Sequence, residues 1–163
     1  MQEFLPYAWF EGKCIPFKDA KVSIATHALH YGTAAFGGMR AIPNPANKDE
    51  FLLFRTDKHI KRLSQSARLL LTEISEDYIF NAIKTILKKN KPTKPIYIRP
   101  FVYTSDLGIA PRLHNIETDF FIYCIELGDY LSPDGVSCRM SSWTRQEDRL
   151  SLIHISEPTR PYW

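Results

Sequence analysis

Arg99 is the side chain whose setting in the sequence offers the most scope for chemistry. It lies in IYIRPFVY, where strand alternation places it on one face with Tyr97, Phe101 and Tyr103. A guanidinium held among aromatic rings needs an anion, although an ion-paired arginine at the rim of a sheet is the more common arrangement. The adjacent Pro100 favours an edge strand or a bulge at this point.

A second arginine, Arg62, lies on a predicted helix beside Ile60 and Leu63. From such a position a planar guanidinium can reach a phosphate and donate two parallel hydrogen bonds to it. Arg62 is therefore a candidate anion ligand. The alternative is a solvated side chain, which is the more common state of a single arginine on a helix.

Histidines and tyrosines supply weaker candidates. His27 and His30 are three residues apart, but no third ligand is near them in the sequence, so we expect structural histidines and no metal site. Tyr31 and Tyr130 carry hydroxyl groups that could orient a substrate, although most tyrosines near turns have no such role.

The composition fits one globular domain and disfavours several classes of function. Of the 163 residues, 44% are hydrophobic and 24% charged, which is enough for one domain with a core. The formal charge of +3 is spread along the chain, so we expect no nucleic-acid partner. We also expect no membrane segment and a cytoplasmic location, because no long apolar run or signal-peptide pattern occurs. The three cysteines, Cys14, Cys124 and Cys138, predict neither a disulfide framework nor a zinc site.

The first fifty residues read as short strands and a glycine-rich segment. Aromatic and apolar residues on both sides of Gly12 predict a hairpin with strands at 7–11 and 13–17. A short irregular or helical stretch should run through His30 and give way to a strand at 38–42. The following PNPANKDE is predicted to be a loop because it combines two prolines with a charge cluster.

Two consecutive helices are predicted in the middle of the chain, after a strand EFLLF. The first lies in RTDKHIKRLSQSARLLL, with Thr56 or Asp57 as its cap, and the second in SEDYIFNAIKTILKKNK, with Ser75 as its cap. Apolar residues recur at helical spacing in both, and lysines follow in the last turn of the second helix, where the dipole favours cations.

Strands return in the second half, at 94–105, 118–130 and 135–143, and LGIAPRLHN is predicted to be a loop. Strands followed by two consecutive helices and further strands predict an α+β fold with a mostly antiparallel sheet.

Five motifs in order resemble one family. THALHYGTAAFGGMR, LFRTDKHIKRLSQSARLL, YIRPFVY, LGDYL and SSWTR are similar to the N-terminal half of a branched-chain amino acid aminotransferase, a fold-type IV pyridoxal-phosphate enzyme. The similarity runs from about Tyr7 to Arg149. It departs from the family pattern at FGGMR, where F-E-G-x-R is commoner, and in IELGDYL, where a tryptophan often found in the family is missing.

This resemblance assigns roles to the two arginines. It implies that Arg62 binds the phosphate of pyridoxal 5'-phosphate. It implies that Arg99, with Tyr31, holds the distal carboxylate of glutamate in a pocket that otherwise accepts the side chains of leucine, isoleucine or valine. Such a dual pocket is physically reasonable when its walls are apolar and its polar group lies at the far rim.

The resemblance also implies the remaining substrate-binding positions, namely Phe36, Gly38, Ile109 and Tyr130. Tyr31 and the loop around Ile109 are expected to reach into the active site of a partner subunit. A homodimer is therefore expected, acting on amino acids and 2-oxo acids.

The implied reaction is amino transfer between branched-chain amino acids and 2-oxoglutarate, by a ping-pong cycle through the pyridoxal and pyridoxamine forms of the cofactor. Alternatives within the fold are a D-amino acid aminotransferase and an aminodeoxychorismate lyase. A non-catalytic α+β dimerisation module is the alternative of a different class.

The last residues of the chain do not fit the family. From Leu150, LSLIHISEPTR matches the codon-by-codon translation of a transposase adapter used in sequencing libraries. We therefore expect a small domain at 1–131, the start of a truncated large domain at 132–149, and non-native adapter read-through at 150–163. The lysine that forms the Schiff base would lie beyond the truncation, so the chain by itself is expected to be inactive.

Overall fold

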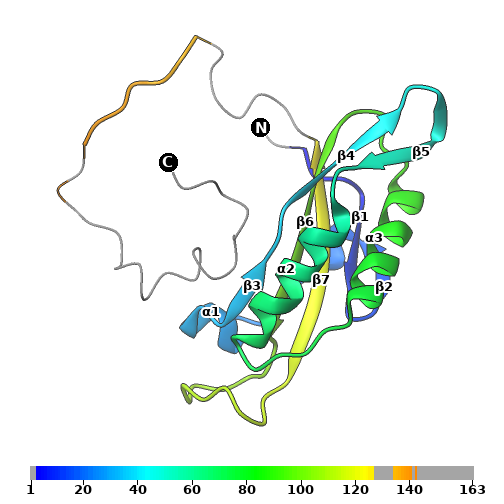
Figure 1. Cartoon of the computed structure of the whole chain (residues 1–163). Helices are drawn as coiled ribbons and strands as arrows, with labels where there is room; N and C mark the ends of the chain where they lie inside the picture. The colour runs from blue at the N-terminus through cyan, green and yellow to red at the C-terminus, as the bar shows by residue number, and fades with distance from the viewer. Residues whose placement is uncertain (1–2, 127–133, 141, 143–163) are drawn as a thin grey trace.

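An antiparallel sheet organises the part of the chain that the computed structural model describes, residues 3–126, 134–140 and 142 (Figure 1). The strand order is β2-β1-β7-β6-β4-β5, and β3 also pairs with β6. The strands are β1 (Tyr7–Phe10), β2 (Lys13–Pro16), β3 (Ala34–Phe36), β4 (Met39–Asn44), β5 (Asn47–Leu53), β6 (Ile96–Thr104) and β7 (Thr118–Glu126). The predicted α+β fold with an antiparallel sheet is confirmed.

Two consecutive helices, α2 (Thr56–Arg68) and α3 (Glu76–Asn90), cover one face of this sheet (Figure 1). A short helix α1 (His27–Tyr31) lies at one end of the sheet, and a 3-10 turn η1 (Phe17–Asp19) follows β2. Among the described residues, no helix is both long and apolar enough to cross a membrane.

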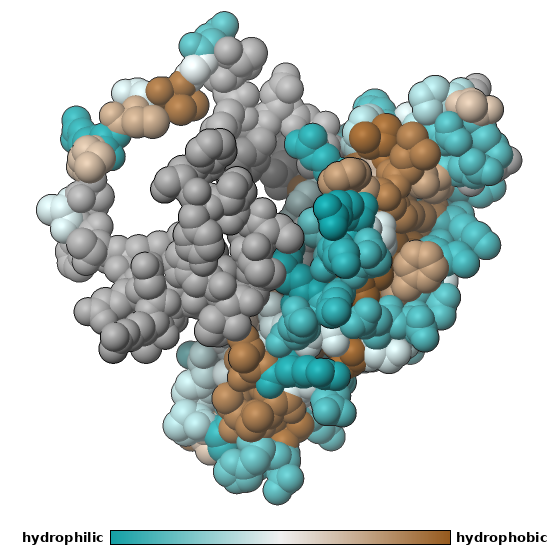
Figure 2. Space-filling view, in the orientation of Figure 1, coloured by the Kyte–Doolittle hydropathy of each residue, from teal (hydrophilic) through white to brown (hydrophobic). Residues whose placement is uncertain are grey.

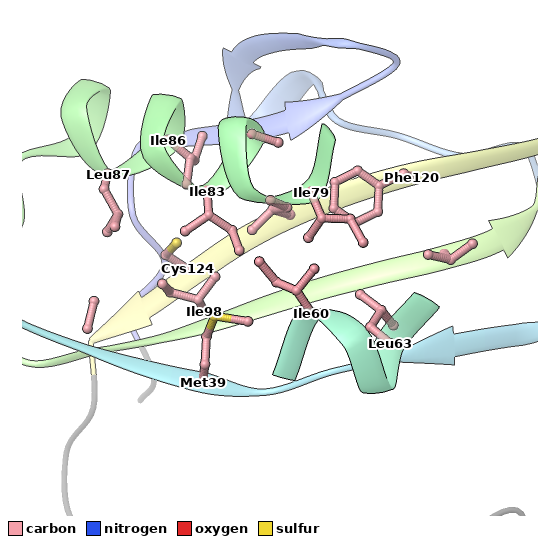
Figure 3. Close-up of a cluster of buried hydrophobic side chains, with 14 of the residues drawn as sticks. Met39, Ile60, Leu63, Ile79, Ile83, Ile86, Leu87, Ile98, Phe120 and Cys124 are labelled. Atoms are coloured by element: carbon pink, nitrogen blue, oxygen red, sulfur yellow. The ribbon is translucent and has the colours of Figure 1, made fainter. Parts of the chain in front are cut away.

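The core lies between the two long helices and the sheet (Figure 3). Ile79, Ile83 and Ile86 of α3 are fully buried, as helical spacing predicts, and they face β6 and β7. Each such side chain contributes about 1.5–3 kcal/mol of hydrophobic stabilisation. Strand β6 presents Ile96, Ile98, Pro100 and Val102 to this core, so its other face carries the residues around Arg99.

The predicted loop at 43–50 is wrong. Strands β4 and β5 form a hairpin there, with Asn44 paired to Asn47 and only Pro45 and Ala46 between them. The Asn44 side chain accepts a hydrogen bond from the Ala46 amide at 3.0 Å, so it replaces a backbone bond in the turn. Pro43 is accommodated where the register of the hairpin shifts.

Two further boundary predictions are wrong, at the start of α2 and at 135–140, whereas Ser75 precedes α3 as predicted. The residue that precedes α2 is Arg55, in the left-handed region, rather than Thr56 or Asp57. Ser75 does precede α3, but its side chain makes no capping hydrogen bond. The strand predicted at 135–143 is wrong over 135–140, which the structure describes as irregular chain.

Candidate functional site

Arg99 lies in the middle of β6, on the face opposite the helices, between two aromatic rings. Its guanidinium carbon is 4.3 Å from the centroid of the Phe36 ring and 5.2 Å from that of Tyr97. Cation–π contacts of this kind contribute about 0.5–2 kcal/mol each. The Nε atom of Arg99 is buried and has no hydrogen-bond partner among the described residues. Buried polar atoms are normally paired, so this atom marks a place where an anion can bind.

The strand beside Arg99 is interrupted at two glycines. β3 and β4 pair with β6 in one common register, Phe36 opposite Phe101 and Met39 opposite Ile98, so Gly37 and Gly38 lie opposite Pro100 and Arg99. Gly37 donates its amide hydrogen to the Pro100 carbonyl at 2.9 Å, but proline has no amide hydrogen to return. Of the two alternatives predicted for Pro100, an edge strand or a bulge, the edge strand is wrong, because β6 is paired on both sides.

Gly38 has no side chain because the ring of Tyr97 occupies that space. A Cβ atom on Gly38 would lie 2.7 Å from Cζ and 2.8 Å from Cε2 of Tyr97, closer than real Cβ contacts. The absence of a side chain at position 38 therefore lets Tyr97 lie beside Arg99.

Tyr97 belongs to the site, and sequence reasoning did not assign it a role. Burial raises the pKa of its hydroxyl, while the positive charges of Arg99 and Arg62 lower it and Tyr123 raises it. Both guanidinium groups thus act on one hydroxyl, although they come from a strand and a helix. The signal for Tyr97 was present in the strand alternation, which placed it on the same face as Arg99.

Arg62 lies half-buried on α2, three residues after His59. Its Nη2 atom is 3.5 Å from Nδ1 of His59. Burial and then the charge of Arg62 lower the pKa of His59, while Asp57 raises it. The lowered pKa favours the uncharged ring, whose Nδ1 can accept a hydrogen from the Arg62 guanidinium when its own hydrogen is on Nε2.

The structure brings Tyr31 to Ile109. The Tyr31 hydroxyl donates a hydrogen bond to the carbonyl of Ile109, and the Ile109 side chain is 84% exposed. His27 and His30 hydrogen-bond to hydroxyl groups and backbone carbonyls, as expected of structural histidines. Tyr130 lies outside the described residues. Within them, no three His, Cys, Asp or Glu side chains are placed to hold a metal ion, and the three cysteines are free.

Comparison with protein families matches residues 35–156 to the model described as amino-transferase class IV, which covers most of the chain. The chain belongs to the class IV aminotransferases. This aminotransferase chain is 62% identical, over 149 residues, to the probable branched-chain-amino-acid aminotransferase of Synechocystis sp.. That match covers 91% of the chain and 49% of the relative, so the chain spans about half the length of the curated relatives it matches.

Solved structures agree with the resemblance. The crystal structure of Escherichia coli branched-chain amino acid aminotransferase matches with a TM-score of 0.70 and 33% identity, over 80% of this chain and 42% of that one. The branched-chain amino acid aminotransferase of T.th., complexed with N-(5'-phosphopyridoxyl)-L-glutamate, matches with a TM-score of 0.66 and 32% identity, over 78% and 42%. The predicted similarity to branched-chain aminotransferases is confirmed.

Proposed function

We propose that this class IV aminotransferase chain is the N-terminal part of an enzyme that transfers amino groups between branched-chain amino acids and 2-oxoglutarate. The observation that carries the proposal is the buried, unpartnered Nε of Arg99 between Phe36 and Tyr97. The positive charge of Arg99 thus lies between two aromatic rings, which form apolar walls on either side of it. A carboxylate can pair with the cation, whereas an aliphatic side chain can pack against the walls.

The proposed cofactor is pyridoxal 5'-phosphate, which serves as an electron sink for amine chemistry. Arg62 would hold its phosphate, because a planar guanidinium, here in contact with Nδ1 of His59, can donate two parallel hydrogen bonds to phosphate oxygens. The T.th. relative was solved with a phosphopyridoxyl compound, which supports this choice. The residues present fit the phosphate end of the cofactor, and the lysine would come from a later segment of the protein.

The proposed amino acceptor is 2-oxoglutarate, which becomes glutamate. Arg99 would bind the distal carboxylate of this substrate, and Tyr97, Phe36 and Gly38 would line the pocket around it. Leucine, isoleucine and valine lack that carboxylate and would contact the aromatic walls instead. Tyr31 and Ile109 are proposed to act together in the active site of a neighbouring subunit, and the hydrogen bond from the Tyr31 hydroxyl to the Ile109 carbonyl supports a joint role.

The proposed partner is a second copy of the chain, docked on the apolar surface around α1. Five exposed apolar side chains form this surface, which we call the α1 patch: Ile24, Leu29, Tyr31, Leu107 and Ile109. Figure 2 shows apolar surface gathered at the end of the molecule that carries α1. Exposed apolar side chains that gather in one patch mark interaction sites, whereas single scattered ones do not.

The proposed domain division keeps residues 1–131 as a small domain and 132–149 as the start of a second one, in a cytoplasmic enzyme. Residues 150–163 are proposed to be non-native. The family match extends to residue 156, inside this segment, so its origin needs a direct test. Sequencing the gene beyond the codon for Arg149 in the source genome would show either family sequence or the LSLIHI segment.

The activity test uses the full-length protein. Purified with cofactor, it should form glutamate from 2-oxoglutarate in the presence of leucine, and it should do so far more slowly with D-alanine as amino donor. Glutamate formation with D-alanine alone would instead support a D-amino acid aminotransferase. No amino transfer with either donor would refute the proposal.

A further inference from the structure

His27 is a buried, polar side chain with no part in the proposed chemistry. It lies at the start of α1 and is 2% exposed. Its Nε2 atom is 2.9 Å from the carbonyl oxygen of Ala110. Its Nδ1 atom is 2.9 Å from the hydroxyl of Thr33 and 3.1 Å from that of Thr104.

The carbonyl partner of His27 fixes the direction of one of these hydrogen bonds. A carbonyl oxygen can only accept, so Nε2 carries the hydrogen that goes to Ala110. The hydroxyls of Thr33 and Thr104 both lie within hydrogen-bond distance of Nδ1 and of each other, and the Thr104 hydroxyl also contacts the backbone carbonyl of Thr33 at 3.3 Å. Both ring nitrogens of His27 and both hydroxyls therefore have a hydrogen-bond partner. Fully satisfied buried networks hold their members rigidly.

This network fastens one loop to α1. Residues 105–117 connect β6 with β7, and three of their carbonyl oxygens accept hydrogens from α1. Asp106 accepts from the amide of His27 at 2.9 Å, Ile109 from the hydroxyl of Tyr31, and Ala110 from Nε2 of His27. A helix of five residues is not stable alone, so α1 and the loop stabilise each other.

We propose that His27 is a positioning residue that locks the loop 105–117 onto α1, so that Tyr31 and Ile109 form one fixed surface. The ring of Tyr31 packs against that of His27, with 4.6 Å between centroids, so the two α1 residues that bind the loop also support each other. The inference rests on the proposed function, because that surface belongs to the α1 patch assigned to a second copy of the chain.

Two variants of the full-length protein distinguish the hydrogen bond from His27 to the loop from the packing of the His27 ring in the core. Asparagine places a polar atom where Nδ1 lies and cannot reach Ala110, whereas glutamine places an amide hydrogen where Nε2 lies. Hydrogen exchange in peptides covering 105–117 should be about tenfold faster in His27→Asn, since one buried hydrogen bond contributes about 1.4 kcal/mol. In His27→Gln it should stay within about threefold of the parent protein.

Exchange in the peptide covering 76–90, the α3 segment, is the control and should not change. In the same enzyme, His27→Asn should raise KM for the amino donor more than it lowers kcat, and His27→Gln should restore KM. The proposal is overturned by unchanged exchange at 105–117 in His27→Asn, by equal acceleration in α3, or by failure of glutamine to rescue. A protein without transaminase activity would refute the proposed function, while the exchange data would still decide the role of His27.

Discussion

Replacing Arg99 with methionine should affect the two substrates of the enzyme very differently. Methionine keeps an unbranched apolar side chain between Phe36 and Tyr97 but removes the charge. A charge-assisted hydrogen bond contributes about 1.5–3 kcal/mol, and the buried Nε offers at least one to a carboxylate. Taking about 2.7 kcal/mol, the KM for 2-oxoglutarate should rise about 100-fold, at 1.4 kcal/mol per factor of ten.

Leucine has no distal carboxylate, so its KM should stay within about threefold of the parent value in Arg99→Met. Steady-state kinetics with each substrate varied in turn measures both constants. Arg68→Met is the matched control, because Arg68 is exposed in the last turn of α2 and should leave both constants unchanged. Equal increases in the KM of leucine and 2-oxoglutarate would show that Arg99 does not discriminate between a carboxylate and an alkyl group.

Four further predictions concern the full-length protein. Gly38→Ala should lower the free energy of unfolding, measured in urea, by about 1–3 kcal/mol, because the new methyl group meets the Tyr97 ring. Gly108→Ala is the control and should have little effect, because its methyl group meets no atom within 4 Å. Arg62→Gln should weaken cofactor binding, followed by absorbance titration, by about 10- to 100-fold, and unchanged affinity would remove Arg62 from the phosphate site. Burial raises the pKa of Asp119 above its ordinary 3.8, against the opposing hydrogen bond from the Phe120 amide. The folded state therefore binds this proton more tightly than the unfolded state, so the free energy of unfolding falls as pH rises from 3.8 through the folded pKa. In Asp119→Asn, the urea midpoint plotted against pH should be flatter over this range. Ile109→Glu should convert a dimer to a monomer in light scattering, and a dimer of unchanged affinity would exclude the α1 patch as the interface.

Elements with a strong hydrophobic period could be predicted from the sequence. The spacing of Ile79, Ala82, Ile83 and Ile86 predicts α3, and these four residues are buried. Alternation in β6 likewise placed Arg99 on the face opposite the core. In both cases the period of burial belongs to the element itself, so no distant contact is needed to recognise it.

Features that depend on contacts between distant or irregular segments could not be predicted. β3 has only three residues, and its pairing with β6 joins residues more than sixty positions apart. The prolines at 43 and 45 predict a loop, whereas the structure forms the β4–β5 hairpin. Its turn depends on a hydrogen bond to the side chain of Asn44, which the sequence pattern does not indicate. Strand alternation placed Tyr97 on the face of Arg99, but the contact of its ring with the space at Gly38 depends on the pairing of β4 with β6 and could not be predicted.

A crystal structure of the full-length protein with N-(5'-phosphopyridoxyl)-L-glutamate would test the roles of both arginines in one measurement. We expect the phosphate within hydrogen-bond distance of the Arg62 guanidinium, and the side-chain carboxylate of the glutamate moiety bound to Nε of Arg99. An adduct whose phosphate and carboxylate are held by other residues, with Nε of Arg99 still unpaired, would contradict the proposed function.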